Sequence, residues 1–391
     1  MTNVYALPNN SQAWQNALDQ VAHLLPANAD GKILMQLPIF AVVVVVNNQA
    51  KEAHFSVDEA VQAWVDTQIG WQIKIVYDDE VAKANAHKIE TDETMSDVSV
   101  HRYLLLPTDN KEMTSQRRDA VAHIIDEQLT VYLKKQIKPA CSSFGVDEHG
   151  QIIEDLPKEK RTCVDVHLLS IAQLLQTPKL VCFDMDSTLI EQEVIVELAK
   201  MCGVSDEVAH ITERAMRGEI DFAQSFAQRV ALLKGVSVDV VDDIIANHIT
   251  FQKGAFTLIQ ALKAHGCHTV LVSGGFVPFA KYVATTLGID EYYANPLLTD
   301  GDSLLGEIDT NIIDGKQKAI IVKSVARKLG LDMGQVVCVG DGANDLPMMD
   351  ISNIGVAYHA KPIVQARADV AVNITGLEGV LYAMGQRFDK V

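Results

Sequence analysis

Three short segments of the chain combine carboxylate, hydroxyl and glycine residues, and each directly follows an apolar run. The segments are residues 184–188 (DMDST), 273–275 (SGG) and 340–345 (GDGAND). Asp184 and Asp186 are two positions apart in a chain that leaves a predicted strand, so both side chains can face the same side. With a further carboxylate from Asp341, several acidic oxygens would converge, and magnesium is a cation that prefers such ligands.

These residue types suit a two-step transfer of a phosphoryl group. A carboxylate can attack phosphorus and form a mixed anhydride, while a second carboxyl group protonates the departing alkoxide and then activates water. Asp184 and Asp186 fit these two roles. Ser273 and the backbone near Gly274 can hold phosphate oxygens, because glycine lets the backbone approach an anion closely.

The same chemistry requires a fixed positive charge on the transferring group. Three lysines lie between the second and third segments, namely Lys316, Lys318 and Lys323. Each segment taken alone is explained at least as well by a solvated turn, since Gly and Asp favour turns. Turn formation does not explain all three in this order, each after an apolar run, and together they predict a catalytic site.

The elements that must position these segments are predicted most clearly after Pro178. Short apolar runs rich in β-branched residues alternate there with helical patterns, which favours a parallel sheet covered by helices on both faces. The predicted strands are residues 179–183, 269–272, 336–339, 354–357 and 370–374. Ligands of such sheets bind beyond the carboxyl ends of the strands. The three segments should therefore meet at one edge of the sheet.

Before Pro178 the patterns are mixed. The predicted helices cover residues 56–67 and 114–136, and a further helix begins after Ser11 with Trp14 and Leu18 on its apolar face. The predicted strands are residues 41–46, 73–77 and 98–106. Strands interleaved with helices indicate one or two small α+β units. The charged stretch 141–161 is predicted to be a loop or linker.

The composition excludes several classes of protein. The chain of 391 residues is 48% hydrophobic and has a formal net charge of −18, so it should repel nucleic acids and anionic membranes. A phosphate substrate would also be repelled unless a local cation or a bound metal reverses the field. Six scattered cysteines without CxxC spacing indicate free thiols in a reducing compartment. No secretory signal is seen and the apolar run 39–46 is far too short to span a membrane, so we expect a cytoplasmic protein.

Four segments resemble the haloacid dehalogenase (HAD) superfamily. They read DMDSTLIEQE, MRGEIDFAQSFAQRVALLKG, LVSGGF and VGDGANDLPMM, the last followed by AYHAKP. The resemblance covers somewhat more than half of the chain. It implies an α/β domain over residues 178–391, with a HAD-like Rossmannoid parallel sheet and a helical cap of about residues 193–252 inserted after the first strand.

Residues 1–175 carry no catalytic motif. Their interleaved strands and helices resemble the small ACT-like, ferredoxin-like α+β folds that regulate some enzymes of this kind. A dimerisation module, which would make the protein a homodimer, and an amino-acid sensor are the two roles that the sequence leaves open for this region.

The resemblance also implies roles for the residues of the three segments. Asp184 corresponds to the nucleophile, and Asp186 to the general acid and base, with its backbone carbonyl on the magnesium ion. Asp341 corresponds to the third protein ligand of magnesium, and Asp345 and Asn344 would support the metal and the phosphate. Ser273 and Gly274 match the phosphate loop. The phosphate lysine is best matched by Lys318, with Lys316 as the alternative.

Substrate recognition is expected in the cap. By resemblance, Glu193 would bind the ammonium group and Arg229 the carboxylate of O-phosphoserine. The residues agree, because Asp221 can cap a helix that places Phe222 and Arg229 on one face, an apolar wall beside a bidentate carboxylate ligand. Without the resemblance, a core-facing helix with a snorkelling arginine would explain the pattern better. Met216 either helps to close the pocket or packs in the core.

The implied function is hydrolysis of O-phospho-L-serine to L-serine and phosphate through an aspartyl-phosphate, the last step of serine biosynthesis. One alternative is a phosphatase or phosphotransferase of the same superfamily that acts on another small phosphomonoester. Another is a non-catalytic ligand sensor, which the intact set of acidic residues, serine and lysine disfavours.

Overall fold

The computed structural model describes residues 164–217, 219–309 and 311–385, together with shorter parts of the preceding chain. Those parts are residues 14, 18, 39–47, 56–68, 71–76, 98–108, 129, 132–133, 145–146 and 152–153. Trp14, Leu18, Leu129 and Leu133 are helical and buried. Tyr132 is also helical and is partly buried. The rest of the two helices predicted after Ser11 and over residues 114–136 lies outside the described residues.

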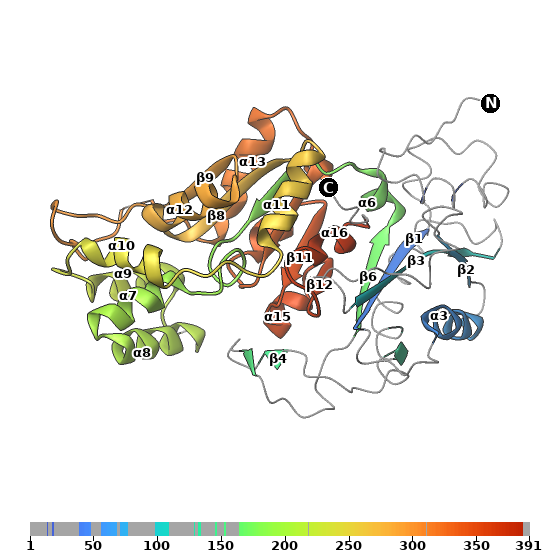
Figure 1. Cartoon of the computed structure of the whole chain (residues 1–391), viewed down its shortest axis with the longest axis horizontal. Coiled ribbons are helices and arrows are strands. Elements are labelled where there is room, and N and C mark those ends of the chain that lie inside the picture. Colours follow the sequence, from blue (N-terminus) through green and yellow to red (C-terminus); the bar gives the residue numbers. More distant parts are fainter. Residues whose placement is uncertain are drawn as a thin grey trace.

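Six parallel strands form the central sheet, in the order β12-β11-β10-β7-β8-β9 (Figure 1). The strands are β7 (Leu180–Phe183), β8 (His268–Phe276), β9 (Glu291–Asn295), β10 (Val336–Gly340), β11 (Ile354–Tyr358) and β12 (Val370–Val372). The predicted parallel α/β sheet is confirmed. The sequence did not predict β9, because this edge strand is only partly buried and carries no apolar run.

Alternate side chains of the sheet pack against helices on opposite faces. One face carries Val181 and Phe183 and packs against three helices. These are α11 (Ala255–Ala264), α12 (Val277–Leu287) and α16 (Gly379–Ala383). The opposite face carries Leu180 and Cys182 and packs against α13 (Gly315–Lys328), α14 (Leu346–Met349) and α15 (Pro362–Gln365). This three-layer arrangement leaves the carboxyl ends of the strands available for ligands.

Four helices inserted between β7 and β8 extend to one end of the molecule, drawn in green and yellow in Figure 1. They are α7 (Val194–Cys202), α8 (Ser205–Met216), α9 (Phe222–Ala231) and α10 (Asp239–Asn247). An isolated bridge pairs Ile190 with Phe251, so the chain enters and leaves this cap side by side. No helix of the described residues has the length and apolar character needed to cross a membrane.

The part of the chain from β7 onward carries the three predicted catalytic segments and is called the catalytic part below. An antiparallel sheet precedes it, with the strand order β2-β3-β1-β6. Its strands are β1 (Phe40–Asn47), β2 (Trp71–Ile75), β3 (Val98–Pro107) and β6 (Val164–Ser170). Helix α3 (Val57–Asp66) begins where Ser56 accepts a hydrogen bond from the N–H of Glu59, and it packs on one face of the sheet. The described part is therefore an α+β unit, as expected. The short helix α6 (Ile171–Leu175) leads from β6 to the catalytic part.

The stretch predicted to be a loop or linker contains two short paired strands. β4 (Gly145–Val146) and β5 (Ile152–Ile153) form an antiparallel ladder. The intervening sequence contains Asp147 and Gly150, residue types that favour turns. The linker interpretation is therefore incomplete for this stretch.

The second face of the antiparallel sheet packs against the catalytic part. Val43 and Val45 belong to the same hydrophobic core as Val181 and Val380. The carboxylate of Asp165, at the edge of the antiparallel sheet, accepts hydrogen bonds from the backbone N–H groups of residues 373 and 374, at 2.7 and 3.0 Å, directly after β12. The two sheets thus meet edge to edge and share one core.

Candidate active site

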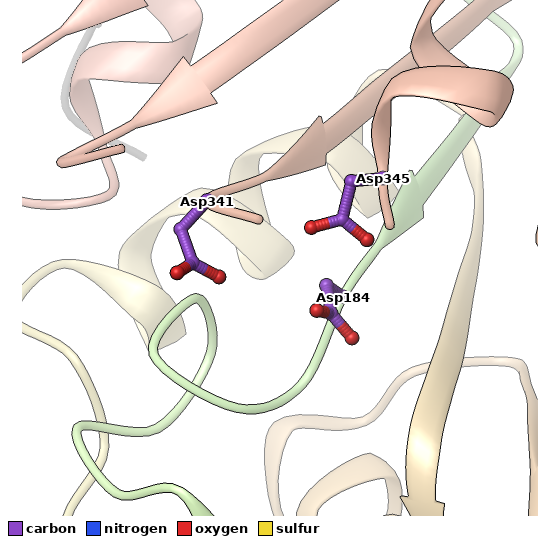
Figure 2. A group of neighbouring side chains, drawn as sticks. All are labelled: Asp184, Asp341 and Asp345. Carbon is purple, nitrogen blue, oxygen red and sulfur yellow. The ribbon is translucent and has the colours of Figure 1, made fainter. Parts of the chain in front are cut away.

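Three carboxylates gather at the carboxyl ends of two neighbouring strands. Asp184 follows β7, and Asp341 and Asp345 lie in the loop between β10 and α14. Because β7 and β10 pair in parallel, their ends lie side by side. Figure 2 shows the three side chains converging, and each offers an oxygen within 4.8 Å of the others.

Lys318 lies between two of these carboxylates. Its Nζ is 2.7 Å from Asp184 Oδ1 and 2.7 Å from Asp345 Oδ1, and its side chain is fully buried. It projects from the first turns of α13, which begins where Asp314 accepts a hydrogen bond from the N–H of Gln317. Lys316, the alternative phosphate lysine, is exposed. Of the two, Lys318 is the lysine that contacts the acidic cluster.

The acidic cluster carries more negative charge than Lys318 balances. Burial and the charge of Asp345 raise the pKa of Asp184 to about 7, against the partial compensation of Lys318. Burial and the same neighbour raise the pKa of Asp341 well above its usual range. Converging carboxylate oxygens with excess charge are the ligand set of a hard metal ion, so the residues present fit a bound metal.

The carboxyl group of Asp186 differs from that of Asp184 in its hydrogen bonding. Its Oδ1 is buried and has no hydrogen-bond partner among the described residues. Burial and the charge of Glu193 raise its pKa well above the usual range. Its Oδ2 is 3.5 Å from where a Cβ on Gly275 would lie, so the carboxyl group faces the segment 273–275. A carboxyl group in this setting holds a proton readily and can donate it.

Residues 273–275 lie within β8, whereas the sequence predicted that they follow the strand. The pairing with β9 shifts register between Val272 and Phe276, so the extended conformation continues through a bulge. Ser273 is 1% exposed, and its Oγ accepts a hydrogen bond from the N–H of Gly275 at 2.8 Å. The segment stays in the strand yet has peptide groups released from regular pairing.

Helix α9 brings the cap over this segment. It begins with a capping box in which the carboxylate of Asp221 accepts from the N–H of Gln224. Phe222, the first residue of α9, lies over Gly274, with its Cζ 3.4 Å from where a Cβ on that glycine would lie. Phe226 stacks on Phe222 and also on Phe276 of β8. A row of aromatic rings therefore joins the cap to the central sheet.

Glu193 and Arg229 lie within electrostatic range of the acidic cluster. Burial lowers the pKa of Arg229, and the charges of Glu193 and Asp186 oppose this effect. The Nε of Arg229 donates to the carbonyl oxygen of Ser225. Glu193 precedes α7 and accepts a hydrogen bond from Ser187 Oγ at 3.1 Å. The two side chains predicted to bind the substrate's amino-acid moiety thus border the same site.

The remaining predicted residues are placed less centrally. The Oδ1 of Asn344 lies against Gly342 in the same loop as Asp341. Met216 is the last residue of α8, and its side chain lies outside the described part of the chain.

Two polar residues at the site were missed by the sequence analysis. The Oγ1 of Thr188 donates to Asp341 Oδ1 at 3.3 Å, and Thr188 is fully buried. Asn295, at the end of β9, donates to the carbonyl oxygen of Gly274 at 2.8 Å. Thr188 belongs to the first acidic segment and could have been singled out there. Asn295 had no signal, since the strand that positions it was not predicted.

Comparisons with known proteins identify the family of the chain. The model of the haloacid dehalogenase-like hydrolase family matches residues 178–350. A probable phosphoserine phosphatase of Schizosaccharomyces pombe is 43% identical over 283 residues, which cover 70% of this chain and 90% of that protein.

Two solved structures are also similar. A phospho-aspartyl intermediate analogue of phosphoserine phosphatase is 36% identical with a TM-score of 0.50, covering 53% of this chain and 99% of that one. A HAD family hydrolase from Salmonella enterica shares the fold, with a TM-score of 0.65 at 22% identity, over 89% of this chain and 99% of that one. The chain therefore belongs to the haloacid dehalogenase-like hydrolase family and, within it, to the phosphoserine phosphatases.

Proposed function

We propose that the chain hydrolyses O-phospho-L-serine to L-serine and phosphate, with Asp184 as the nucleophile and magnesium as the metal. The observation that carries this proposal is the convergence of Asp184, Asp341 and Lys318 at one sheet edge, in a chain related to phosphoserine phosphatases. A carboxylate held by a buried ammonium group is fixed in place for attack on a phosphoryl group.

In the first step a carboxylate oxygen of Asp184 attacks phosphorus, and the bond from phosphorus to the serine oxygen breaks. Asp186 donates its proton to that oxygen, so serine leaves as an alcohol. Ser273, the peptide groups near Gly274 and the ammonium group of Lys318 hold the phosphoryl oxygens as charge develops on them.

In the second step the aspartyl-phosphate on Asp184 is hydrolysed. Asp186, now a carboxylate, takes a proton from a water molecule, and the oxygen of that water attacks phosphorus. The bond between phosphorus and Asp184 breaks, which restores the nucleophile and releases phosphate. Asp186 recovers its proton in this step and is ready to act as an acid again.

The carboxylates of Asp184 and Asp341 and the backbone carbonyl of Asp186 would hold the magnesium ion, with Asp345 and Asn344 in support. The ion supplies positive charge that draws in the phosphate and stabilises charge on the phosphoryl oxygens during transfer. Four acidic side chains close to the site make such a charge necessary, because Lys318 alone leaves a net negative field.

The substrate's amino-acid moiety is recognised by the cap. Glu193 can pair with its ammonium group and Arg229 with its carboxylate. Phe222 provides an apolar wall over residues 273–275. Arg229 is partly buried, so an ion pair with the substrate would be screened less than one at the surface.

The test is a phosphate-release assay over a panel of phosphorylated metabolites, with and without magnesium. We expect turnover of O-phosphoserine that requires magnesium, loss of turnover in a folded Asp184→Asn protein, and a large drop in kcat/KM for O-phosphoserine in Arg229→Ala. Near-normal activity of Asp184→Asn would refute the nucleophile. Preference for another phosphomonoester, unaffected by Arg229→Ala, would refute the substrate.

We further propose a cytoplasmic role in serine biosynthesis, since the product is a free amino acid. Residues 178–391 would form the catalytic domain with a cap at about 193–252, and residues 1–175 an ACT-like regulatory domain. A thermal-shift titration of the full chain with L-serine tests a sensing role for the latter. An unchanged melting temperature at saturating serine would leave dimerisation as its role.

A further inference from the structure

Residues 273–275, called the phosphate-binding segment after their proposed role, lie where β8 and β9 lose their regular pairing. Val272 pairs with Tyr293 and Phe276 pairs with Asn295, so three residues of β8 stand opposite one residue of β9. A bulge of this kind releases peptide groups from the ladder and re-aims them, and such bulges often lie beside active sites. The released peptide groups need other partners, because Ser273 is buried and the two glycines are partly buried.

The side chain of Asn295 supplies one of these partners. Its Nδ2 donates to the carbonyl oxygen of Gly274 at 2.8 Å, and its Oδ1 accepts from the N–H of Ile313 at 2.8 Å. Asn295 is 2% exposed, so water has little access to either hydrogen bond. An amide meets one acceptor and one donor here, a combination that neither a carboxylate nor an aliphatic side chain can provide.

The hydrogen bond to Gly274 sets the direction of the next N–H group. In a trans peptide unit the carbonyl of Gly274 and the N–H of Gly275 point in opposite directions. Holding the carbonyl toward Asn295 turns this N–H to the other side, where Ser273 Oγ accepts it at 2.8 Å. Asp186 is close to the same glycine. The orientation of the segment toward the reacting groups therefore depends on the amide of Asn295.

The second hydrogen bond of Asn295 connects the segment to the buried lysine. Ile313 directly precedes Asp314, the residue that caps α13, and α13 carries Lys318. The carbonyl oxygen of Ile313 is also 3.4 Å from where a Cβ on Gly274 would lie, so the two backbones pack closely. The side chain of Asn295 thus joins the phosphate-binding segment to the start of α13, the helix that carries Lys318.

We propose that Asn295 is a positioning residue that holds residues 273–275 in the orientation that binds a phosphoryl group, in register with Lys318. It acts through the backbone of Gly274 and does not contact the substrate. This role rests on the proposed function in that the segment must bind a phosphoryl group, whichever phosphomonoester supplies it.

The decisive variants are Asn295→Asp and Asn295→Ser. The carboxylate of the first can still accept from Ile313 but cannot donate to Gly274, and the second removes both hydrogen bonds without adding charge. Asn353→Ser is the matched control, because the side chain of Asn353 also donates to a backbone carbonyl, that of Gln173 at 3.3 Å. Asn353 directly precedes β11, at the amino end of the strands and away from the site. We would measure kcat, KM, competitive inhibition by inorganic phosphate, and the melting temperature, all with magnesium.

Both Asn295 variants should lower kcat/KM for O-phosphoserine and weaken inhibition by phosphate, each by about tenfold or more, because a buried acceptor loses its donor beside the phosphoryl group. The control should stay within about twofold on both measures, even if its melting temperature falls. Asn295 variants that melt earlier but keep both kinetic measures within about twofold of the wild type would overturn the proposal, since Asn295 would then serve only the fold.

Two further outcomes, an Asp variant that does not fold and a wild type that does not hydrolyse O-phosphoserine, can be told apart from failure of the positioning role. If the Asp variant gives no cooperative melting, the Ser variant decides by the same two measures. If the wild type does not hydrolyse O-phosphoserine, the proposed substrate fails, and calorimetric titration of wild type and variants with inorganic phosphate still tests Asn295. Equal phosphate affinity in all of them would refute the positioning role.

Discussion

At the scale of single residues, the charge around Asp184 is held in place by Lys318. This ammonium group is fully buried and contacts both Asp184 and Asp345 at 2.7 Å. A buried ion group is stable only while its partners are present, and removal of one partner typically costs about 3–5 kcal/mol. Lys318 therefore contributes to folding, in addition to its proposed role in binding the phosphoryl group.

Replacement of Lys318 by Met should remove both contributions. We expect phosphate release to fall by about 10²-fold or more and the free energy of unfolding to fall by about 3 kcal/mol, because two buried carboxylates lose their cation. Urea denaturation and the phosphate-release assay measure the two effects. The control is Lys316→Met, which should change the free energy of unfolding by less than about 0.5 kcal/mol, since Lys316 is exposed. Loss of activity in Lys316→Met, with normal activity in Lys318→Met, would identify Lys316 as the phosphate lysine instead.

The residues that the sequence identified share a feature that Asn295 lacks. Asp184, Ser273 and Asp341 each stand in a short motif directly after an apolar run, so residue type and position gave the same indication. Asn295 is an isolated amide whose importance comes from contacts with Gly274 and Ile313, both distant in sequence. Contacts of this kind arise from the packing of the strands and cannot be read from local patterns.

At the scale of elements, two capped helices carry side chains of the proposed active site. Helix α9 begins at Asp221 and carries Phe222 and Arg229, and α13 begins at Asp314 and carries Lys318. A cap fixes where a helix begins and hence which side chains face a neighbour. The caps in this enzyme therefore help to set the geometry of the site.

Loss of the α9 cap should affect substrate binding more than chemistry. We expect Asp221→Ala to lower the free energy of unfolding by about 1 kcal/mol and to raise KM for O-phosphoserine more than it lowers kcat, because fraying of α9 displaces Phe222 and Arg229. Steady-state kinetics and urea denaturation give both quantities. Ser56→Ala removes the cap of α3, so it should cost similar stability with KM unchanged. An equal rise of KM in both variants would contradict this role.

The elements were predictable where burial leaves a continuous apolar run. The strands β7, β10 and β11 are buried throughout and were found within a residue or two of their ends. The end of β8 was missed because glycine and serine indicate a turn, whereas the bulge keeps them extended beside β9. The predicted strand over residues 73–77 lies two residues early in the structure, as β2 over Trp71–Ile75.

At the scale of the whole molecule, the antiparallel sheet and the catalytic part share a core. We propose that they unfold together, because side chains from both sheets pack in one cluster. His167 of β6 is 1% exposed, and its Nδ1 has no partner among the described residues. Val43 pairs with both His167 and the buried Arg102, so a protonated His167 would share its sheet face with another cation.

The contribution of His167 to stability should therefore fall on acidification. Burial lowers the pKa of His167 from 6.5 to about 4, so the unfolded chain binds a proton in this interval that the folded protein does not. The contribution of His167 to the free energy of unfolding must then decrease as the pH falls from 6.5 toward 4, by up to about 3 kcal/mol. Buried carboxyl groups whose pKa is raised, such as Asp184, change the free energy of unfolding in the opposite direction. In urea denaturation at several pH values, the difference in free energy of unfolding between the wild type and His167→Gln should shift against the wild type as the pH falls from 6.5 toward 4. The exposed His210, changed to Gln, should leave the pH dependence of the free energy of unfolding as it is in the wild type. An equal pH dependence in all three proteins would refute the assignment.

The carboxylate of Asp165 lies beside the edge strand β12 of the central sheet. An open sheet edge presents unpaired N–H groups that can recruit a strand from another molecule and start aggregation. Asp165 binds two backbone N–H groups of the loop directly after β12, and this contact holds the antiparallel sheet beside that edge strand of the central sheet. Proteolytic removal of the antiparallel sheet would uncover this edge, so a truncated catalytic part should precipitate or form fibrils more readily than the full chain.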